Sequence, residues 1–201
     1  EIYKKVSKYS LLINTPIFLI ISLLSKDIVL SLFGDNYIRA ALPLTILSLG
    51  YFLFSLSDIS MNMLSVIKKT KTIFSIIAAF ALSNVILNYF LIPKYNIIGA
   101  AIATSISFLI GALLMISISY YHSKLHPFMF KYKKILASLI ITAVLTLVIK
   151  NNISFIPKIN LLIFIVIILL IYTILVYILK ILEKEDFELI KDMKNKIIKR
   201  V

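Results

Sequence analysis

Apolar residues fill this chain in six long stretches, and a short polar segment separates each stretch from the next. A helix needs about 20 mainly apolar residues to cross roughly 30 Å of hydrocarbon. A β-barrel would instead show segments of about ten residues in which apolar and polar positions alternate. The continuous runs therefore predict an all-α polytopic membrane helix bundle of about six transmembrane helices, over 9–33, 40–66, 72–92, 98–121, 134–149 and 159–181.

The composition supports a membrane protein and argues against a soluble domain. Hydrophobic residues make up 61% of the chain, charged residues 15%, and the mean hydropathy is +1.02. Soluble domains carry about 25% charged residues. The chain contains no cysteine, so neither a disulfide framework nor a thiolate metal site is possible.

Basic residues are distributed unequally between the segments that connect the predicted spans. Seventeen lysines and arginines lie at the two ends and in the alternate loops on that side, and five lie in the opposite loops. Because basic loops stay in the cytoplasm, we expect a multi-pass protein of the cytoplasmic membrane with both ends of this chain cytoplasmic. The net charge of +13 is then explained by anionic lipid headgroups, and no nucleic-acid partner is expected.

The composition changes after the last apolar run. We assign residues 1–182 to the transmembrane bundle and 183–201 to a cytoplasmic tail. In the tail, Phe187, Ile190, Ile197 and Val201 recur at helical spacing among many charged residues. This pattern is typical of an amphipathic helix on the inner leaflet. A solvated, partly frayed tail is the alternative.

A row of polar residues crosses the second predicted span. Ionisable groups at membrane depth are costly and are usually retained for function, and Asp58 is the only acid of this kind. Residues three or four positions apart share one helical face, so a continuous helix would place six polar side chains together: Ser48, Tyr51, Ser55, Asp58, Asn62 and Ser65. We expect this face to line the protein interior or a water-filled cavity.

Two interpretations of these polar residues stay open. Asp58 either has a transport role, by binding a coupling cation (a proton or sodium) or by helping to line the substrate path, or it forms a hydrogen bond that fixes packing. In the third span, Asn84 and Asn88 lie one turn apart and either join helices or line the cavity. The fourth span contains small residues every four positions, at Ala103, Ser107 and Gly111, which favours close helix packing.

No group of residues predicts covalent chemistry or a cofactor. His122 and His126 have the spacing of a helical metal pair, but Pro127 follows and no carboxylate or cysteine is near. The four scattered glycines form no phosphate-binding loop, and there is no nucleophile elbow. We therefore expect no enzyme, no metal and no cofactor.

Three segments within about 10–120 resemble the polysaccharide flippases of the multidrug/oligosaccharidyl-lipid/polysaccharide exporter superfamily. NVILNYFLIPKYNIIGAAIAT resembles the family's N-x-x-x-N helix, its L-I-P turn and its G-A-A-I-A-T helix, with Asn96 in place of the signature's first glycine. LFGDNYIRAALPLTILSLGYF resembles the family's LFG-x-x-Y-x-x-A segment and the span that follows it. VIKKTK occupies the position of the family's small basic turn but lacks its glycine.

This resemblance implies that the chain is the C-terminal part of a two-lobe transporter, and the first residue, Glu1 rather than Met, is in keeping with a missing N-terminal part. Its cargo would be a polyprenyl-diphosphate-linked oligosaccharide, turned to the outer leaflet by alternating access for surface polysaccharide assembly. Asp58, Asn62, Tyr51, Ser55, Asn84 and Asn88 are the candidates for the substrate path or cation coupling. A diphosphate also suggests basic residues in the cavity, and none lies deep in these six spans. The anion site would then be in the absent N-terminal part, or at the rim near Lys26, Arg39 or Lys94.

Two other functions fit the same pattern of spans. A cation-coupled multidrug or small-molecule exporter of the same superfamily would show cation-dependent efflux. A membrane scaffold subunit would not transport and would show a dry, fully packed face on the second span.

Overall fold

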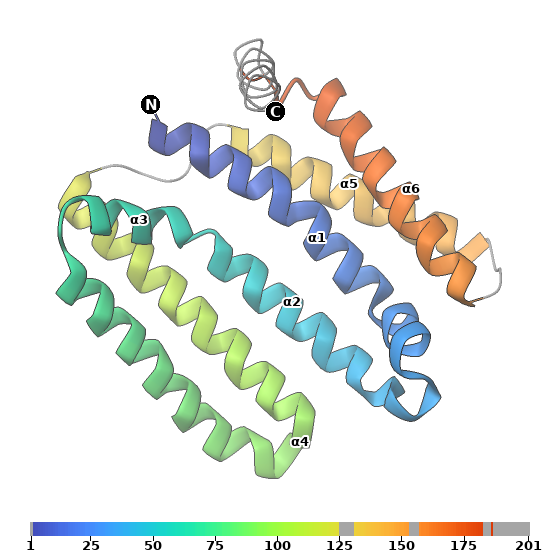
Figure 1. The fold of residues 1–201 in the computed structure, drawn as a ribbon, viewed down its shortest axis with the longest axis horizontal. Helices are drawn as coiled ribbons and strands as arrows, with labels where there is room; N and C mark the ends of the chain where they lie inside the picture. The colour runs from blue at the N-terminus through green and yellow to red at the C-terminus, as the bar shows by residue number, and fades with distance from the viewer. Residues whose placement is uncertain (1, 125–130, 153–156, 183–185, 187–201) are drawn as a thin grey trace, which may run out of the picture.

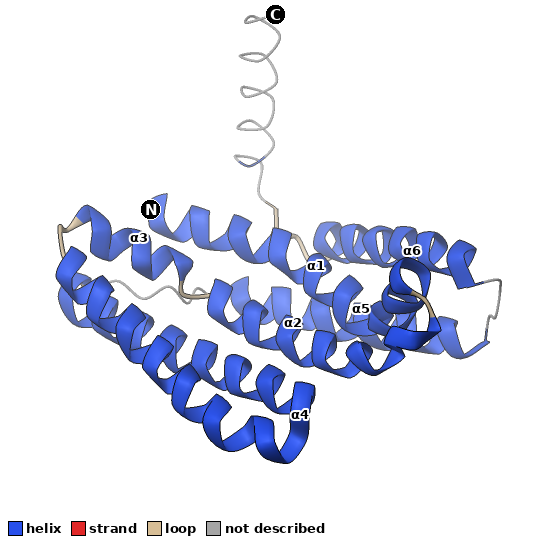
Figure 2. Cartoon of the chain, turned by 60° about the horizontal axis from the view of Figure 1, so that its bottom comes forward, coloured by secondary structure: helices blue, strands red, loops and turns tan. Residues whose placement is uncertain are grey.

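The computed structural model describes residues 2–124, 131–152, 157–182 and 186, and these residues form helices and short connections with no β-strand (Figures 1 and 2). The elements are α1 (Ile2–Phe33), the 3-10 helix η1 (Asp35–Ala40), α2 (Ala41–Ser55), α3 (Asp58–Val66), α4 (Thr70–Ser123), α5 (Lys131–Asn152) and α6 (Pro157–Ile178). The amphipathic tail helix expected over 183–201 lies outside the described residues, apart from Asp186.

Helix α4 is a hairpin that provides two membrane spans. Its 54 residues would extend about 80 Å as a straight helix, but the backbone reverses at Asn96, where φ is 50° and ψ is −130°. The two arms lie side by side (Figure 1), and Asn84 Nδ2 is 3.2 Å from Thr104 Oγ1 of the other arm. Among the described residues, five helical segments are long and apolar enough to span a membrane, and the reversal divides the longest of them, α4, into two arms. The predicted all-α polytopic bundle is confirmed.

The second predicted span is interrupted rather than continuous. Helix α2 ends at Ser55 and α3 begins at Asp58. Between them the backbone makes tighter bonds to the third preceding residue, from Leu56 N to Leu53 O (3.3 Å) and from Ser57 N to Phe54 O (2.8 Å). The Ser55 and Ser57 hydroxyls also donate to backbone carbonyls three residues earlier. Serines that bond back in this way bend helices, which explains a break that has neither proline nor glycine.

The helices pack in an order that places α2 at the centre. It lies between α1 and the α4 hairpin, while α5 and α6 cover another side of α1 (Figure 1). One apolar core joins α1 to α5 and α6 through residues that include Leu19, Ile135 and Ile168. A smaller core joins α3 to both arms of α4. The bundle therefore has two packed parts, with α2 between them.

Small side chains allow the closest helix contacts. Ala103, Ser107 and Gly111 are all buried, and a β-carbon on Gly111 would lie 3.2 Å from Phe80 of the other arm. This confirms the packing role predicted for the three residues. On α5, Thr142 and Thr146 lie one turn apart and are fully buried, and neither hydroxyl has a hydrogen-bond partner among the described residues.

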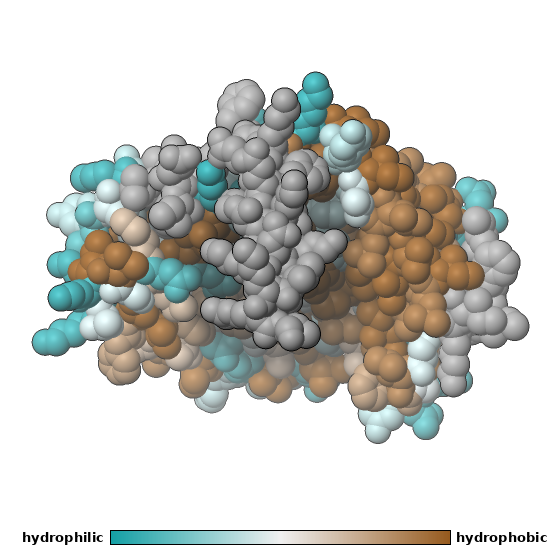
Figure 3. Space-filling view, turned by 45° about the horizontal axis from the view of Figure 1, so that its top comes forward, coloured by the Kyte–Doolittle hydropathy of each residue, from teal (hydrophilic) through white to brown (hydrophobic). Residues whose placement is uncertain are grey.

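Ion pairs lie toward the ends of the bundle. Lys150 Nζ is 2.5 Å from Asp27 Oδ2, which joins the end of α5 to α1. Lys8 Nζ is 2.5 Å from Asp186 Oδ2, and both side chains are buried. Between the ends the outer surface is largely apolar, and Figure 3 shows a broad hydrophobic area with hydrophilic residues gathered toward the left edge of that face. This surface suits contact with lipid tails.

Candidate functional site

The structure separates the predicted site residues into two places. One group lies on the central α2–α3 segment, and the other lies inside the α4 hairpin. The first group contains Tyr51, Ser55, Asp58 and Asn62, and the second contains Asn84 and Asn88.

Asp58 is the first residue of α3, at the break in the central span. Its side chain is partly exposed and has no hydrogen-bond or ion-pair partner among the described residues. A carboxylate in the first turn is favoured by the partial positive charge of the helix N-terminus. Asp58 is therefore held at a helix end while its oxygens stay available to other groups.

The break changes the predicted polar face. Ser55 is buried, and its hydroxyl bonds to Phe52 O at 2.7 Å. Tyr51 is 63% exposed, and Asn62 is also exposed. The expectation that all these side chains share one face of a continuous helix is therefore wrong, because the tight turn at 56–57 interrupts the regular 3.6-residue period.

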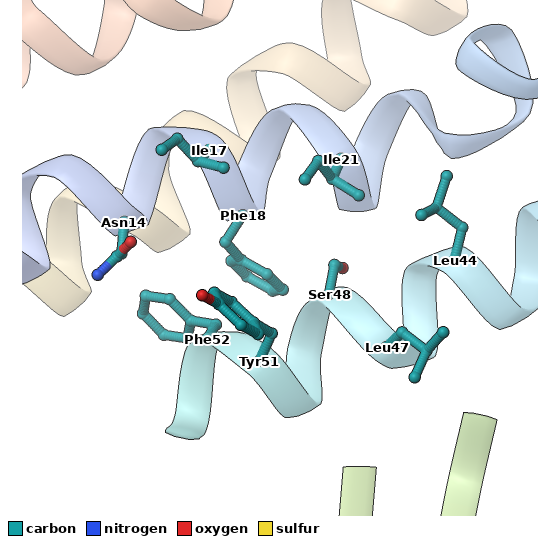
Figure 4. Close-up of a pocket in the computed structure, with 9 residues that line it drawn as sticks. All are labelled: Asn14, Ile17, Phe18, Ile21, Leu44, Leu47, Ser48, Tyr51 and Phe52. Atoms are coloured by element: carbon teal, nitrogen blue, oxygen red, sulfur yellow. The ribbon is translucent and has the colours of Figure 1, made fainter. Parts of the chain in front are cut away.

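A groove between α1 and α2 contains part of this polar set (Figure 4). Its volume is about 210 Å³, and most of its wall is apolar. The polar residues in the wall are Asn14, Ser48 and Tyr51. The sequence reasoning missed Asn14, although an amide within the first apolar run could have identified it. The wall of the groove therefore contains hydroxyl and amide groups within the membrane-spanning part of the bundle.

A cluster of aromatic side chains packs α2, which forms one wall of the groove, against the α4 hairpin. The rings of Phe54, Phe80 and Phe108 meet with centroid distances between 5.0 and 6.3 Å, and Tyr51 contacts Phe108 edge-on at 6.2 Å. These rings join α2 to both arms of α4. The sequence did not predict that these aromatic residues would contact one another, because phenylalanine is common throughout apolar spans.

Asn84 and Asn88 bond to groups within the hairpin. Asn84 Nδ2 lies 3.2 Å from Thr104 Oγ1, and Asn88 donates to Asn84 Oδ1 at 2.9 Å. Buried amides between helices commonly contribute about 0.6 kcal/mol each to membrane helix association. Asn84 joins the two arms, whereas Asn88 bonds only to Asn84 on its own arm. Each asparagine also lines a hollow, and Asn88 Oδ1 is buried without a partner among the described residues, so both interpretations stay open.

The available groups suit hydrogen bonding to a polar cargo. The groove presents the Ser48 and Tyr51 hydroxyls and the Asn14 amide, and α3 adds the Asp58 carboxylate and the Asn62 amide. These groups are donors and acceptors for sugar hydroxyls or water. Among the residues that the structure describes, no three His, Asp or Glu side chains come together as metal ligands would.

Comparison with known proteins relates the chain to transporters. No family model matches it. It is 36% identical over 107 residues to an uncharacterized membrane protein of Methanocaldococcus jannaschii, which covers 53% of this chain and 21% of that protein. It is also 36% identical over 106 residues to a Shigella flexneri protein named as an O-antigen transporter, covering 52% of this chain and 25% of the relative. The chain thus spans a quarter or less of the length of these curated relatives.

A solved structure shows the same arrangement over most of the chain. The lipid II flippase MurJ, in its inward closed conformation, matches with a TM-score of 0.76 and 25% sequence identity. The match covers 88% of this chain and 38% of the flippase.

Proposed function

We propose that this chain, which belongs to the superfamily of polysaccharide and lipid-linked saccharide flippases, is the C-terminal part of one such transporter. Its cargo would be an oligosaccharide on a polyprenyl diphosphate, moved across the cytoplasmic membrane for surface polysaccharide assembly. The rest of the transporter, membrane lipids and this cargo are the proposed partners.

The exposed polar side chains on both parts of the α2–α3 segment are the observation that supports this proposal most directly. Tyr51 and Asn62 are exposed on a membrane-spanning segment, and the Asp58 carboxylate has no partner among the described residues. Lipid tails offer such groups no hydrogen bonds. We infer that these side chains contact water in a cavity whose other wall belongs to the remainder of the transporter.

The size of the groove supports the same inference. Ligand pockets for drug-sized molecules usually measure about 300–1,000 Å³, whereas the groove between α1 and α2 measures about 210 Å³. An oligosaccharide therefore does not fit in the groove alone. As one wall of a shared cavity, its hydroxyl and amide groups would contact the sugars.

Alternating access is the proposed mechanism. A wet cavity that opens first to the cytoplasm and then outward lets sugars and a diphosphate cross without entering hydrocarbon. The excess of basic residues at both ends and in the alternate loops supports a cytoplasmic location for both ends of this chain. No bond in the cargo has to form or break.

Asp58 is the proposed coupling or cargo-contact residue on this wall. As the one acid of the α2–α3 segment at membrane depth, it would take up a proton or sodium, or accept hydrogen bonds from sugar hydroxyls. We expect Asp58→Asn to alter the dependence of transport on pH or sodium. Asp35→Asn removes the same charge from exposed η1 and serves as the matched control.

Mass spectrometry of polyprenyl-linked lipids from cells that lack the gene tests the function. Accumulated lipid-linked oligosaccharide is expected, and its mass identifies the cargo. An unchanged lipid profile, in cells shown to make such lipids, would contradict the proposal. Altered drug sensitivity with cation-dependent efflux would instead identify a small-molecule exporter.

A further inference from the structure

A second hollow lies where the end of α1, η1 and the tip of the α4 hairpin meet. Its volume is about 640 Å³. The polar part of its wall consists of Lys26, Arg39, Tyr95 and Asn96, and isoleucine, leucine and alanine side chains form the rest. The proposed orientation places this end of the bundle at the outer face of the membrane.

Neither cation of this hollow has an ion-pair or hydrogen-bond partner among the described residues. The acid next to Lys26 in sequence is Asp27, but its carboxylate bonds to Lys150. Asp27 is therefore engaged with Lys150 rather than with Lys26, and Arg39 forms no ion pair with an acid of the described residues, Asp35 of η1 included. Two cations on one concave wall form a region of positive potential at the depth of the lipid headgroups.

The hairpin tip adds two side chains to this wall. Asn96 adopts φ 50° and ψ −130°, a left-handed conformation that residues other than glycine adopt only at an energetic cost. The tight reversal of the backbone places Tyr95 and Asn96 on the wall of this hollow. Strained backbone of this kind is concentrated at functional sites.

Lys94 lies only two residues before Asn96 but lines a different hollow, with Val85, Asn88 and Pro93. The structure therefore separates one basic residue of the hairpin tip from the other two cations. This separation supplies a control with the same charge and nearly the same sequence position.

We propose that Lys26, Arg39 and the hairpin tip bind the diphosphate of the lipid-linked cargo at the outer end of the bundle. This inference rests on the proposed function. Arginine binds phosphate oxygens through two parallel N–H bonds, and lysine adds a point charge. Tyr95 and Asn96 supply further donors, and the volume lies in the range of ligand pockets. The apolar part of the wall suits the first carbons of the polyprenyl chain.

Binding of undecaprenyl diphosphate to the complete protein in detergent, measured by native mass spectrometry, tests this site. We expect the double variant Lys26→Gln, Arg39→Gln to lose about tenfold or more in affinity, and Lys94→Gln to stay within about twofold of the wild type. Arg39→Lys alone keeps the positive charge but removes the planar guanidinium that forms two parallel hydrogen bonds, so it should give an intermediate loss of affinity. Thermal melting checks that the variants are folded, as expected for exposed side chains.

Equal binding by the wild type and the double variant would overturn the site while leaving the proposed function intact, since the lipid profile of the deletion strain tests that function separately. Equal losses in Lys94→Gln and the double variant would show a general charge effect and would also overturn it. If the double variant binds phosphatidylglycerol less tightly than the wild type but binds undecaprenyl diphosphate equally well, the hollow would be a site for bulk phospholipid instead. A wild-type protein that binds no undecaprenyl diphosphate would contradict both this inference and its premise.

Discussion

Replacing Gly99 with alanine is expected to destabilise the α4 hairpin severely. An added β-carbon would lie 2.2 Å from the carbonyl oxygen of Leu91 and 2.6 Å from its carbonyl carbon. Both are backbone atoms, so no change of side-chain rotamer relieves the clash. The turn must open by about 1 Å to reach even a tight contact. Overpacking usually costs about 1–3 kcal/mol, and we expect a value at or above the upper end.

Gly111→Ala is the matched control, because it is the same substitution twelve residues further along the same arm of the hairpin. Its β-carbon would lie 3.2 Å from Phe80 Cβ and 3.3 Å from two ring carbons. These atoms belong to a side chain that can move by a few tenths of an ångström. We therefore expect a loss of stability of about 1 kcal/mol or less.

Thermal unfolding of this 201-residue chain in detergent, followed by size-exclusion chromatography after heating, measures the difference. A change of 1 kcal/mol shifts the Tm of a domain of this size by roughly 2–4 °C. Gly99→Ala should therefore lower the Tm by roughly 6–12 °C and Gly111→Ala by less than about 4 °C. A Tm for Gly99→Ala equal to that of the wild type, or a larger loss in Gly111→Ala, would refute the close contact at this turn.

Other substitutions probe the remaining contacts by the same measurement of unfolding. Thr142→Val removes a buried hydroxyl that has no partner in the described part of the chain, so stability should rise by up to about 1 kcal/mol, and a loss would reveal a hidden hydrogen bond. Asp27→Asn should cost about 1 kcal/mol by weakening the partly exposed pair with Lys150. Adding Lys150→Gln should then cost little more, whereas additive losses would argue against the pair. Asn96→Gly relieves the left-handed backbone and should stabilise the hairpin by about 1 kcal/mol, while weakening diphosphate binding if the amide is a ligand.

The membrane spans could be predicted from the sequence because the requirement is local. A helix must cross the hydrocarbon with apolar side chains, so each run of the required length indicates a span without knowledge of its neighbours. The turn between the third and fourth spans was expected as a short loop, and the structure narrows the reversal to Asn96. The residue pattern also identified the small residues that pack at Ala103, Ser107 and Gly111.

The candidate site was predictable only in part. Polar residues at membrane depth are conspicuous in an apolar segment, which is why Asp58 and Tyr51 could be identified from the sequence. Their assignment to one face assumed a continuous helix, and hydrogen bonds of the Ser55 and Ser57 hydroxyls interrupt that helix. Serine forms such bonds in some helices and not in others, so the residue type alone did not predict the break.

The sequence by itself determined the class of the protein, its spans and the distribution of its basic loops, because hydrophobic length and charge act on each segment separately. Only the tertiary structure decided which distant side chains meet. It joined Lys150 to Asp27, and it brought Lys26 and Arg39, which have no ion-pair partner in the part of the chain that the structure describes, to the hairpin tip. Lys94 lines another hollow. Such contacts depend on how whole helices pack against one another, and the shapes of both surfaces determine that packing.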